Sequence, residues 1–133
     1  MVAVRFKLPA AGSGGAYIAY KRSAAAFPVC SAGIQLTLDP GNVCRDVRIV
    51  LGGAGPTPRR AIAAEAELRG KVLSDALWRR AADAASAVAE PNSDVRGSAE
   101  YKHNLLRGLI MQAANVAVRR CANVKIEGSH VYA

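Results

Sequence analysis

The first half of the chain largely alternates apolar and polar residues, and a period of two is typical of half-buried β-strands. Residues 2–8 (VAVRFKL) follow this alternation and predict a strand that ends at Pro9. Residues 9–16 are small and predict a flexible linker. Residues 16–22 (AYIAYKR) contain β-favouring side chains and predict a second strand.

The next two strands are predicted to form a hairpin. Ile34, Leu36 and Leu38 alternate with polar residues, and residues 43–51 return with the same alternation. Between them lies the segment Asp39–Asn42, in which Pro40 presets one φ angle and the following glycine accepts a positive one. Each strand therefore has one face for a core and one face for water.

From residue 59 onward the apolar residues recur at helical spacing. Three helices are predicted, over residues 59–69, 75–90 and 99–121. Gly70 can end the first helix, and the hydroxyls of Ser74 and Ser98 can cap the second and third. Apolar side chains are expected to form one buried stripe on each helix: Ile62, Ala66 and Leu68; Leu77, Ala81, Ala84 and Val88; and Tyr101, Leu105, Leu109, Ala113 and Val116.

The order of these elements predicts the fold class. Strands come first and helices last, without the alternation of strand and helix that builds parallel sheets. We therefore expect an α+β domain, in which an antiparallel sheet is covered on one face by helices.

Length and composition fit one small domain. The chain has 133 residues, half of them hydrophobic, and no apolar run long enough to span a membrane. The opening residues lack the features of a signal peptide. Its three cysteines are widely spaced, which favours reduced thiols in a cytoplasm over disulfides or a metal site.

The net charge of +8 raises the question of an anionic partner. The basic residues are mostly arginines, scattered singly or in pairs, with no aromatic residues interleaved. Scattered solvated arginines or an acidic protein partner are favoured over a nucleic-acid groove, although a nucleic-acid binder stays open as a third hypothesis.

Several motifs are suggestive, but none makes a complete active site. Gly52–Gly55 lies between a strand and a helix, yet its spacing differs from phosphate loops, so a tight corner is expected. The two histidines, His103 and His130, lack metal-ligand spacing. Glu65 and Glu67 point to different faces of a helix. No catalytic residue and no metal ligand is predicted.

The loop from Asp94 to Ser98 is the most interesting polar segment. Charged, glycine-containing loops often carry function. The simpler interpretation is that Asp94 and Arg96 tie the loop to the end of a helix. Both interpretations remain open from the sequence.

Three segments in order resemble one known family. These are residues 19–36 (AYKRSAAAFPVCSAGIQL), 46–71 (DVRIVLGGAGPTPRRAIAAEAELRGK) and 94–114 (DVRGSAEYKHNLLRGLIMQAA). They are similar to the C-terminal domain of the FAD-binding medium subunit of molybdenum hydroxylases, the group of carbon monoxide and xanthine dehydrogenases. The resemblance implies a two-layer sandwich in which an antiparallel sheet of three to four strands is followed by three helices.

The resemblance also implies how the chain is organised. Residues 1–14 correspond to a linker strand leading from a missing FAD-binding domain, residues 15–121 to the C-terminal domain, and residues 122–133 to a tail. Tyr20 and Lys21 would lie near the flavin, only in an assembled subunit. Arg22, Asp94 and Arg96 are the remaining candidates, as interface or loop residues.

The function expected from the resemblance is accessory. The chain would support the FAD site and subunit assembly for electron transfer, without binding a cofactor or catalysing a reaction alone. Its partners would be an FAD-binding domain or subunit, a small subunit with 2Fe-2S clusters and a large subunit with molybdopterin. We expect no nucleic-acid or membrane partner. The alternative is a stand-alone protein-interaction module that kept the fold without flavin.

Overall fold

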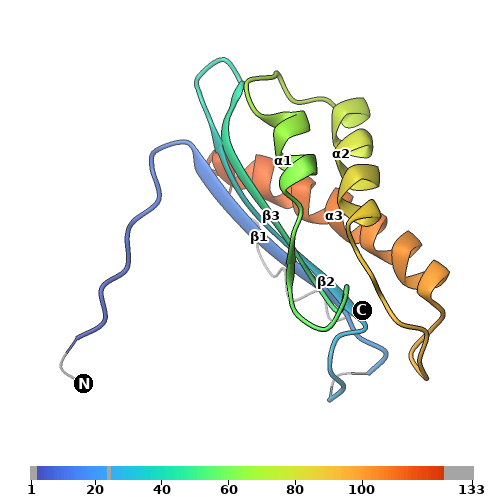
Figure 1. Ribbon diagram of the computed structural model, residues 1–133. Helices are drawn as coiled ribbons and strands as arrows, with labels where there is room; N and C mark the ends of the chain where they lie inside the picture. Colours follow the sequence, from blue (N-terminus) through green and yellow to red (C-terminus); the bar gives the residue numbers. More distant parts are fainter. Residues whose placement is uncertain (1–2, 24, 125–133) are drawn as a thin grey trace.

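The protein is a two-layer α+β domain, seen in a computed structural model that describes residues 3–23 and 25–124 (Figure 1). One layer is an antiparallel sheet in the order β1-β2-β3-β4, and the other layer is three helices. The strands are β1 (Ser13–Tyr20), β2 (Cys30–Leu38), β3 (Cys44–Gly52) and β4 (Arg59–Arg60). The helices are α1 (Ile62–Leu68), α2 (Asp75–Ala87) and α3 (Ala99–Cys121). The predicted fold class is confirmed.

The predicted hairpin forms between β2 and β3. The side chain of Asp39 accepts hydrogen bonds from the backbone N–H groups of Gly41 and Val43, both at 2.9 Å. The positive φ of this turn, 60°, lies at Asn42 and not at Gly41 as predicted, and asparagine tolerates this left-handed conformation better than most residues. The turn chemistry of Asp39–Asn42 therefore sets the register of the two central strands.

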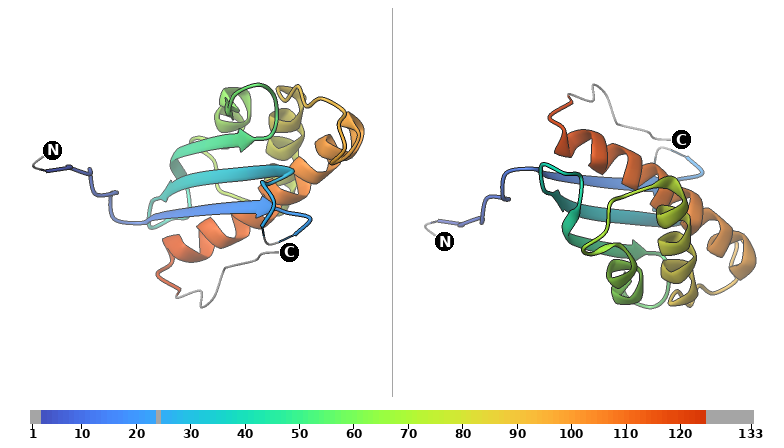
Figure 2. Two further views of the ribbon diagram at one scale, coloured as in Figure 1. Left: turned by 90° about the horizontal axis from the view of Figure 1, so that it is seen from below. Right: turned by 90° about the horizontal axis from the view of Figure 1, so that it is seen from above.

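The core lies between the sheet and the helices. Alternate strand residues such as Ile18, Leu36 and Ile49 turn toward the helices and are almost fully buried. Helix α3 crosses β1 and β2 on this side (Figure 2). A Cβ atom at Gly14 would lie 2.3 Å from the carbonyl oxygen of Ala117, so the backbone of α3 touches the sheet at this glycine.

Local capping signals place the starts of α2 and α3 as predicted, whereas α2 ends at Ala87, before the predicted residue 90. The Ser74 hydroxyl accepts a hydrogen bond from the Leu77 N–H at 3.2 Å, and the Ser98 hydroxyl accepts one from the Tyr101 N–H at 3.1 Å. Gly70 follows α1 with a φ of 73°. These caps satisfy backbone groups that the helices leave unpaired.

Two predicted elements are wrong in the described part of the chain. Residues 3–10 form no strand there, because a strand needs a neighbour to bond with. Arg59 and Arg60 form β4 rather than the start of a helix, since they pair with Leu51 and Val50. The linker prediction also ran too long, because β1 already begins at Ser13.

The predicted buried stripes were only partly right. Ile62, Val88 and Tyr101 are exposed by 65%, 37% and 44%. The buried stripe of each helix is rotated from the prediction and includes Glu65 on α1, Trp78 on α2 and Lys102 on α3. The prediction gave apolar side chains priority, whereas two charged side chains are buried through their partners.

The cysteines are unpaired thiols, as predicted: Cys30, Cys44 and Cys121. None of the described helices has the length and apolar character needed to cross a bilayer. The expected tail beyond residue 124 and His130 lie outside the described residues.

Candidate functional site

The sheet face opposite the helices carries the first part of the candidate site. Figure 1 shows all three helices on one side of the sheet and no element of the described chain over the other. On this open face Tyr17, Gly33 and Val50 lie opposite one another on three strands. The Tyr17 side chain is 65% exposed, and its ring lies 3.7 Å from where a Gly33 Cβ would be.

A groove of about 640 Å³ extends from Tyr17 toward the end of the sheet. Its apolar walls include Tyr17, Phe27, Pro28 and Val50, and Arg96 reaches its edge. Glycines make its floor, so another surface can approach the backbone closely. Exposed apolar area of this kind marks a place where another molecule binds.

The second part of the site is the corner where β1 ends. The Arg22 guanidinium donates a hydrogen bond of 3.1 Å to the carbonyl oxygen of Val95. A hydrogen bond to the Tyr20 side chain raises the pKa of Tyr101. Two segments more than 70 residues apart in sequence are thus joined at this corner, the end of β1 and the loop before α3.

The loop before α3 is held in place by the buried side chain of Lys102, at the start of α3. Lys102 is only 4% exposed, and its Nζ donates 2.6 Å to the Asn92 carbonyl and lies 2.8 Å from the Asp94 carboxylate. The hydrogen bond from Lys102, followed by one from the Arg96 backbone N–H, lowers the pKa of Asp94. Asp94 is therefore a firmly ionised partner for the lysine. We call Lys102, Asn92 and Asp94 the Lys102 cluster.

The structure brings the predicted residues Arg22, Asp94 and Arg96 to this one corner. Tyr20 also lies there, but with the buried positions Ile18 and Ala16 it faces the helix side and packs against the core. Lys21 is the next residue along the chain, half-buried and engaged in an interaction.

Tyr17 and Lys102 are central to the site and escaped the sequence analysis. Tyr17 could have been found, because it alternates with Ala16 and Ile18 and so belongs to the opposite face. Lys102 could not, because a lysine on an otherwise regular helix is expected in solvent. Its burial depends on loop carbonyls that periodicity does not reveal.

The glycine segment 52–55 forms a tight corner, as predicted, and not a phosphate loop. Gly53 has a φ of 67°, and a Cβ there would lie 2.4 Å from the Val29 carbonyl oxygen. The Ala54 carbonyl accepts a hydrogen bond from the Glu90 N–H at 2.7 Å. The glycines let the chain turn sharply against its neighbours.

The remaining polar candidates serve the fold. Arg60 donates to both carboxylate oxygens of Glu65 at 2.8 and 2.9 Å, and the Ile49 N–H donates at 3.0 Å. Arg69 lies 3.5 Å away, so Glu65 fastens α1 and β4 to β3. We call these four residues the Glu65 cluster. His103 hydrogen-bonds to Ser86 on α2 at 3.1 Å, an interhelical contact.

The three thiols are unsuited to acid–base or nucleophilic chemistry at neutral pH. Burial raises the pKa of Cys44 to about 11, and burial also raises the pKa of Cys30 and Cys121. Thiols with raised pKa values stay protonated at neutral pH and are poor nucleophiles. Among residues 3–23 and 25–124, no group of three metal-ligating side chains is gathered.

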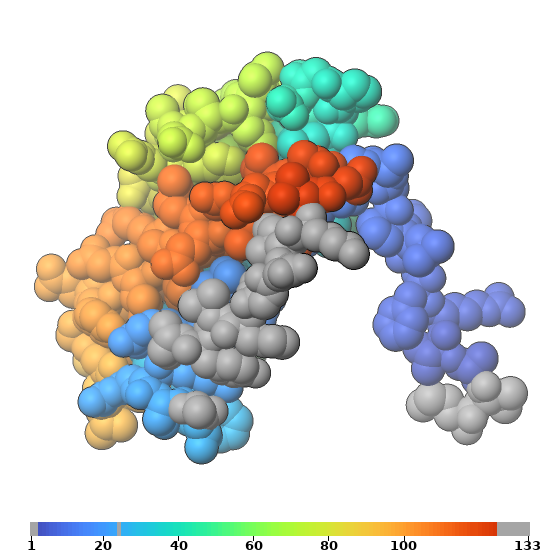
Figure 3. All heavy atoms as spheres, turned by 180° about the vertical axis from the view of Figure 1, so that it is seen from behind, coloured from blue at the N-terminus to red at the C-terminus, as the bar shows by residue number. Residues whose placement is uncertain are grey.

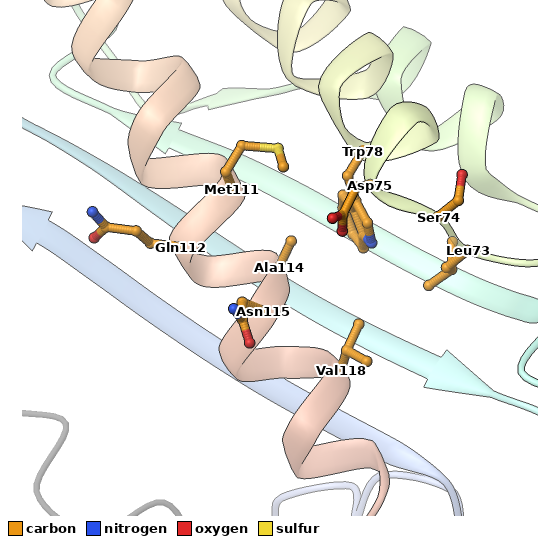
Figure 4. A pocket seen from close by; sticks show the side chains of 9 residues that line it. All are labelled: Leu73, Ser74, Asp75, Trp78, Met111, Gln112, Ala114, Asn115 and Val118. Carbon is orange, nitrogen blue, oxygen red and sulfur yellow. The ribbon is translucent and has the colours of Figure 1, made fainter.

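A second groove, of about 470 Å³, separates α2 from the C-terminal half of α3. Trp78 and Leu73 line one side, and Met111, Ala114 and Val118 line the other (Figure 4). Its polar contributors are neutral apart from Asp75 at the start of α2. The groove has an apolar lining but no set of groups that converge on a ligand.

Comparison with known proteins gives a consistent result. Residues 15–117 match the family described as the CO dehydrogenase flavoprotein C-terminal domain. The medium chain of carbon monoxide dehydrogenase from Hydrogenophaga pseudoflava is 34% identical over 122 residues, which cover 92% of this chain and 42% of the relative. The medium chain from Afipia carboxidovorans is 31% identical over 123 residues, with the same two coverages of 92% and 42%.

Solved structures agree. A carbon monoxide dehydrogenase structure from Hydrogenophaga pseudoflava, which lacks the Mo-pyranopterin moiety of the molybdenum cofactor, is similar with a TM-score of 0.80 and 38% identity. The match covers 84% of this chain and 39% of that chain. The present chain thus spans about two fifths of the length of the relatives it matches.

Proposed function

The chain belongs to the CO dehydrogenase flavoprotein C-terminal domain family, and from this premise we propose that it is an accessory, non-catalytic part of a flavin-bearing, molybdenum-dependent oxidoreductase. Its role is to support the FAD site and the assembly of the subunits through which electrons pass. The observation that carries the proposal is the open sheet face with its apolar groove, which the described chain leaves uncovered.

The residues of the open face fit one side of a flat aromatic group. Tyr17 offers an exposed ring over a glycine floor, and Arg96 offers a positive charge at the groove edge. The glycine corner at residues 52–55 is poorly suited to the diphosphate of FAD, because Pro56 and Pro58 next to it lack backbone N–H donors. The chain thus supplies a wall for a flavin that another domain holds.

A bound flavin supplies the ability to accept and release one or two electrons. The chain's own residues would cover one side of that flavin and place the positive charge of Arg96 nearby, which would stabilise negative charge on the ring. Lys21 and Tyr20 near the flavin remain a prediction. Because Tyr20 faces the helices, Tyr17 is the tyrosine that we propose to meet a partner on the open face.

The opening residues are suited to a linker that would become a strand only beside another domain. Val4, Phe6 and Leu8 are exposed by 62%, 85% and 84% and alternate with Arg5 and Lys7. The segment stands clear of the body (Figure 3). An extended segment with one apolar side is suited to join the sheet of an FAD-binding domain, on the same chain or another.

The remaining partners follow from the proposed assembly. We propose a small subunit with 2Fe-2S clusters and a large subunit with molybdopterin, all in the cytoplasm. The names of the matched relatives support a multi-subunit setting, since both are called medium chains.

The proposal is tested by disrupting the open face. Tagged wild-type chain and Tyr17→Arg are recovered from the protein's own cells under native conditions, and FAD is measured per chain by absorbance and native mass. We expect FAD-bearing complex with wild type and little with Tyr17→Arg. The matched control is Ile62→Arg, because Ile62 is also 65% exposed but lies on α1. Equal recovery of FAD by both variants would contradict the proposal.

A stand-alone interaction module is the second candidate. It is favoured by the hydrophobic core, which draws its buried residues from the elements β1 through α3 of this chain. This candidate predicts a stable particle whose native mass contains neither FAD nor a larger subunit.

A further inference from the structure

The loop between α2 and α3 combines a rigid frame with an exposed apolar tip. Val95 at the tip is 92% exposed, more than any other large hydrophobic side chain among the described residues. Asp94 and Gly97 exchange two backbone hydrogen bonds, of 3.1 and 3.0 Å, across the tip. The Asp94 carboxylate also accepts the Arg96 N–H at 2.9 Å.

The frame extends beyond the loop on both sides. Arg22, at the end of β1, holds the Val95 carbonyl, and the Ser93 hydroxyl accepts the Ala99 N–H at 2.9 Å. Gly97 has a φ of 151°, and a Cβ there would lie 2.6 Å from the Tyr101 ring. The tip is therefore fixed from the strand side and from the helix side.

Burying the Lys102 ammonium is costly unless it is paired and hydrogen-bonded. Lys102 Nζ contacts the carbonyl of Asn92 and the carboxylate of Asp94, both in this loop. The free-energy cost of burying Lys102 is thus offset by these two contacts. The same contacts hold the loop in one conformation. A loop that is already ordered loses less entropy when it binds a partner.

We infer that Asp94–Gly97 is a preformed docking knob, held by Lys102 as a positioning residue. Val95 inserts into an apolar socket on the partner, and Arg22 and Arg96 meet carboxylates at the rim of that socket. The occupant is the flavin-binding part, and in this the inference rests on the proposed function. Arg96 links the two surfaces, because it also lines the groove beside Tyr17 and Phe27.

The charge of the chain supports an acidic socket. A chain of net charge +8 with two arginines beside the knob is attracted by carboxylates and repelled by a basic surface. Arginine is among the residue types that most often dominate binding energy at interfaces. The association should therefore weaken as salt is raised.

Hydrogen exchange on the isolated chain tests the frame. We expect the amides of Arg96 and Gly97 to exchange at least tenfold more slowly in wild type than in Lys102→Met. Amides of β2 report whether Lys102→Met is still folded, and Asp94→Asn provides a milder second variant. Exchange of the wild-type loop amides at the rate of an unprotected peptide would overturn the inference.

Complex formation tests the knob. In native recovery from the protein's own cells, Val95→Glu should lower the yield of FAD-bearing complex at least tenfold. The control is Val72→Glu, because Val72 is 63% exposed outside the open face and the loop. If Val95→Glu gives as much FAD-bearing complex as wild type and only Tyr17→Arg loses it, the docking role of Asp94–Gly97 is wrong. The proposed function would still stand. A wild-type chain recovered without FAD would contradict both the docking role of the loop and the proposed function.

Discussion

Glu65 and Lys102 are the two charged side chains that are buried within the described residues, and they do different work. The Glu65 cluster joins β3, β4 and α1, three elements of the domain. Burial opposes ionisation of Glu65, but hydrogen bonds from Arg60 and the Ile49 N–H, with the Arg60 and Arg69 charges, leave its pKa below the ordinary value. The Lys102 cluster holds a single loop whose tip is in solvent.

The comparison shows that the buried charge of Glu65 holds elements of the fold together, whereas the buried charge of Lys102 shapes a surface loop. Removing Glu65 would detach α1 and β4 from the sheet edge. Removing Lys102 would free the loop beside the end of β1 and leave the sheet and its core in place. The first cluster should therefore dominate stability, and the second should dominate the shape of the docking corner.

The largest expected effect is on the Glu65 cluster. Glu65→Ala leaves the buried Ile49 N–H without an acceptor and the half-exposed Arg60 without its carboxylate, and losing hydrogen bonds to a charged group costs about 1.5–3 kcal/mol. Urea denaturation would measure this loss of unfolding free energy. The control is Glu67→Ala, because the side chain of Glu67 is 35% exposed and pairs at the surface with Arg80 and Lys71. Glu67→Ala should lower the unfolding free energy by less than about 1 kcal/mol. Equal losses for the two variants would contradict the greater structural role of Glu65.

Lys102→Met should cost less than Glu65→Ala. It leaves the Asn92 carbonyl without its lysine donor and Asp94 with only the Arg96 N–H, a loss of about 1–3 kcal/mol. Denaturant unfolding gives the magnitude, and circular dichroism should show an unchanged fold. A loss as large as that of Glu65→Ala would show that this cluster also supports the core.

Two glycines, Gly97 just before α3 and Gly108 in its interior, sharpen the same contrast. Gly97→Ala puts a Cβ against the Tyr101 ring and strains the backbone, which should cost about 1–3 kcal/mol. Gly108→Ala, inside α3 with no atom within 4 Å of the new Cβ, should stabilise by about 0.4–1 kcal/mol. Thermal melting should show shifts of opposite sign, and shifts of the same sign would contradict the rigid loop.

The smallest effect is the dependence of stability on pH. The pKa of Glu65 lies below its ordinary value of 4.5, so the unfolded state binds more protons as the solution becomes acidic. The stabilisation is complete above about pH 4.5 and is lost as pH falls through the folded pKa. Asp94, with a pKa below 3.8, adds to the loss at lower pH. Glu65→Gln should flatten the curve, and a curve parallel to wild type below pH 4.5 would contradict this account.

The sequence predicts the elements that depend on neighbouring residues. The hairpin turn at Asp39–Asn42 and the caps at Ser74 and Ser98 follow from chemistry within a few positions, and all are confirmed. The order of strands and helices was sufficient for the fold class. The family resemblance, resting on three ordered segments, is also confirmed.

What could not be predicted depends on distant partners. Lys102 is buried only because the carbonyl of Asn92 and the carboxylate of Asp94 turn toward it. Glu65 is buried because the N–H of Ile49 lies beside it on β3, 16 positions away. The opening alternation at residues 2–8 predicted a strand, but alternation does not supply the neighbour that a strand requires.

Native mass spectrometry of the chain, isolated from its own cells without denaturation, tests the central claim most directly. The account predicts an assembly that contains this chain, larger subunits and the mass of FAD. A bare monomer or homo-oligomer without flavin would contradict it.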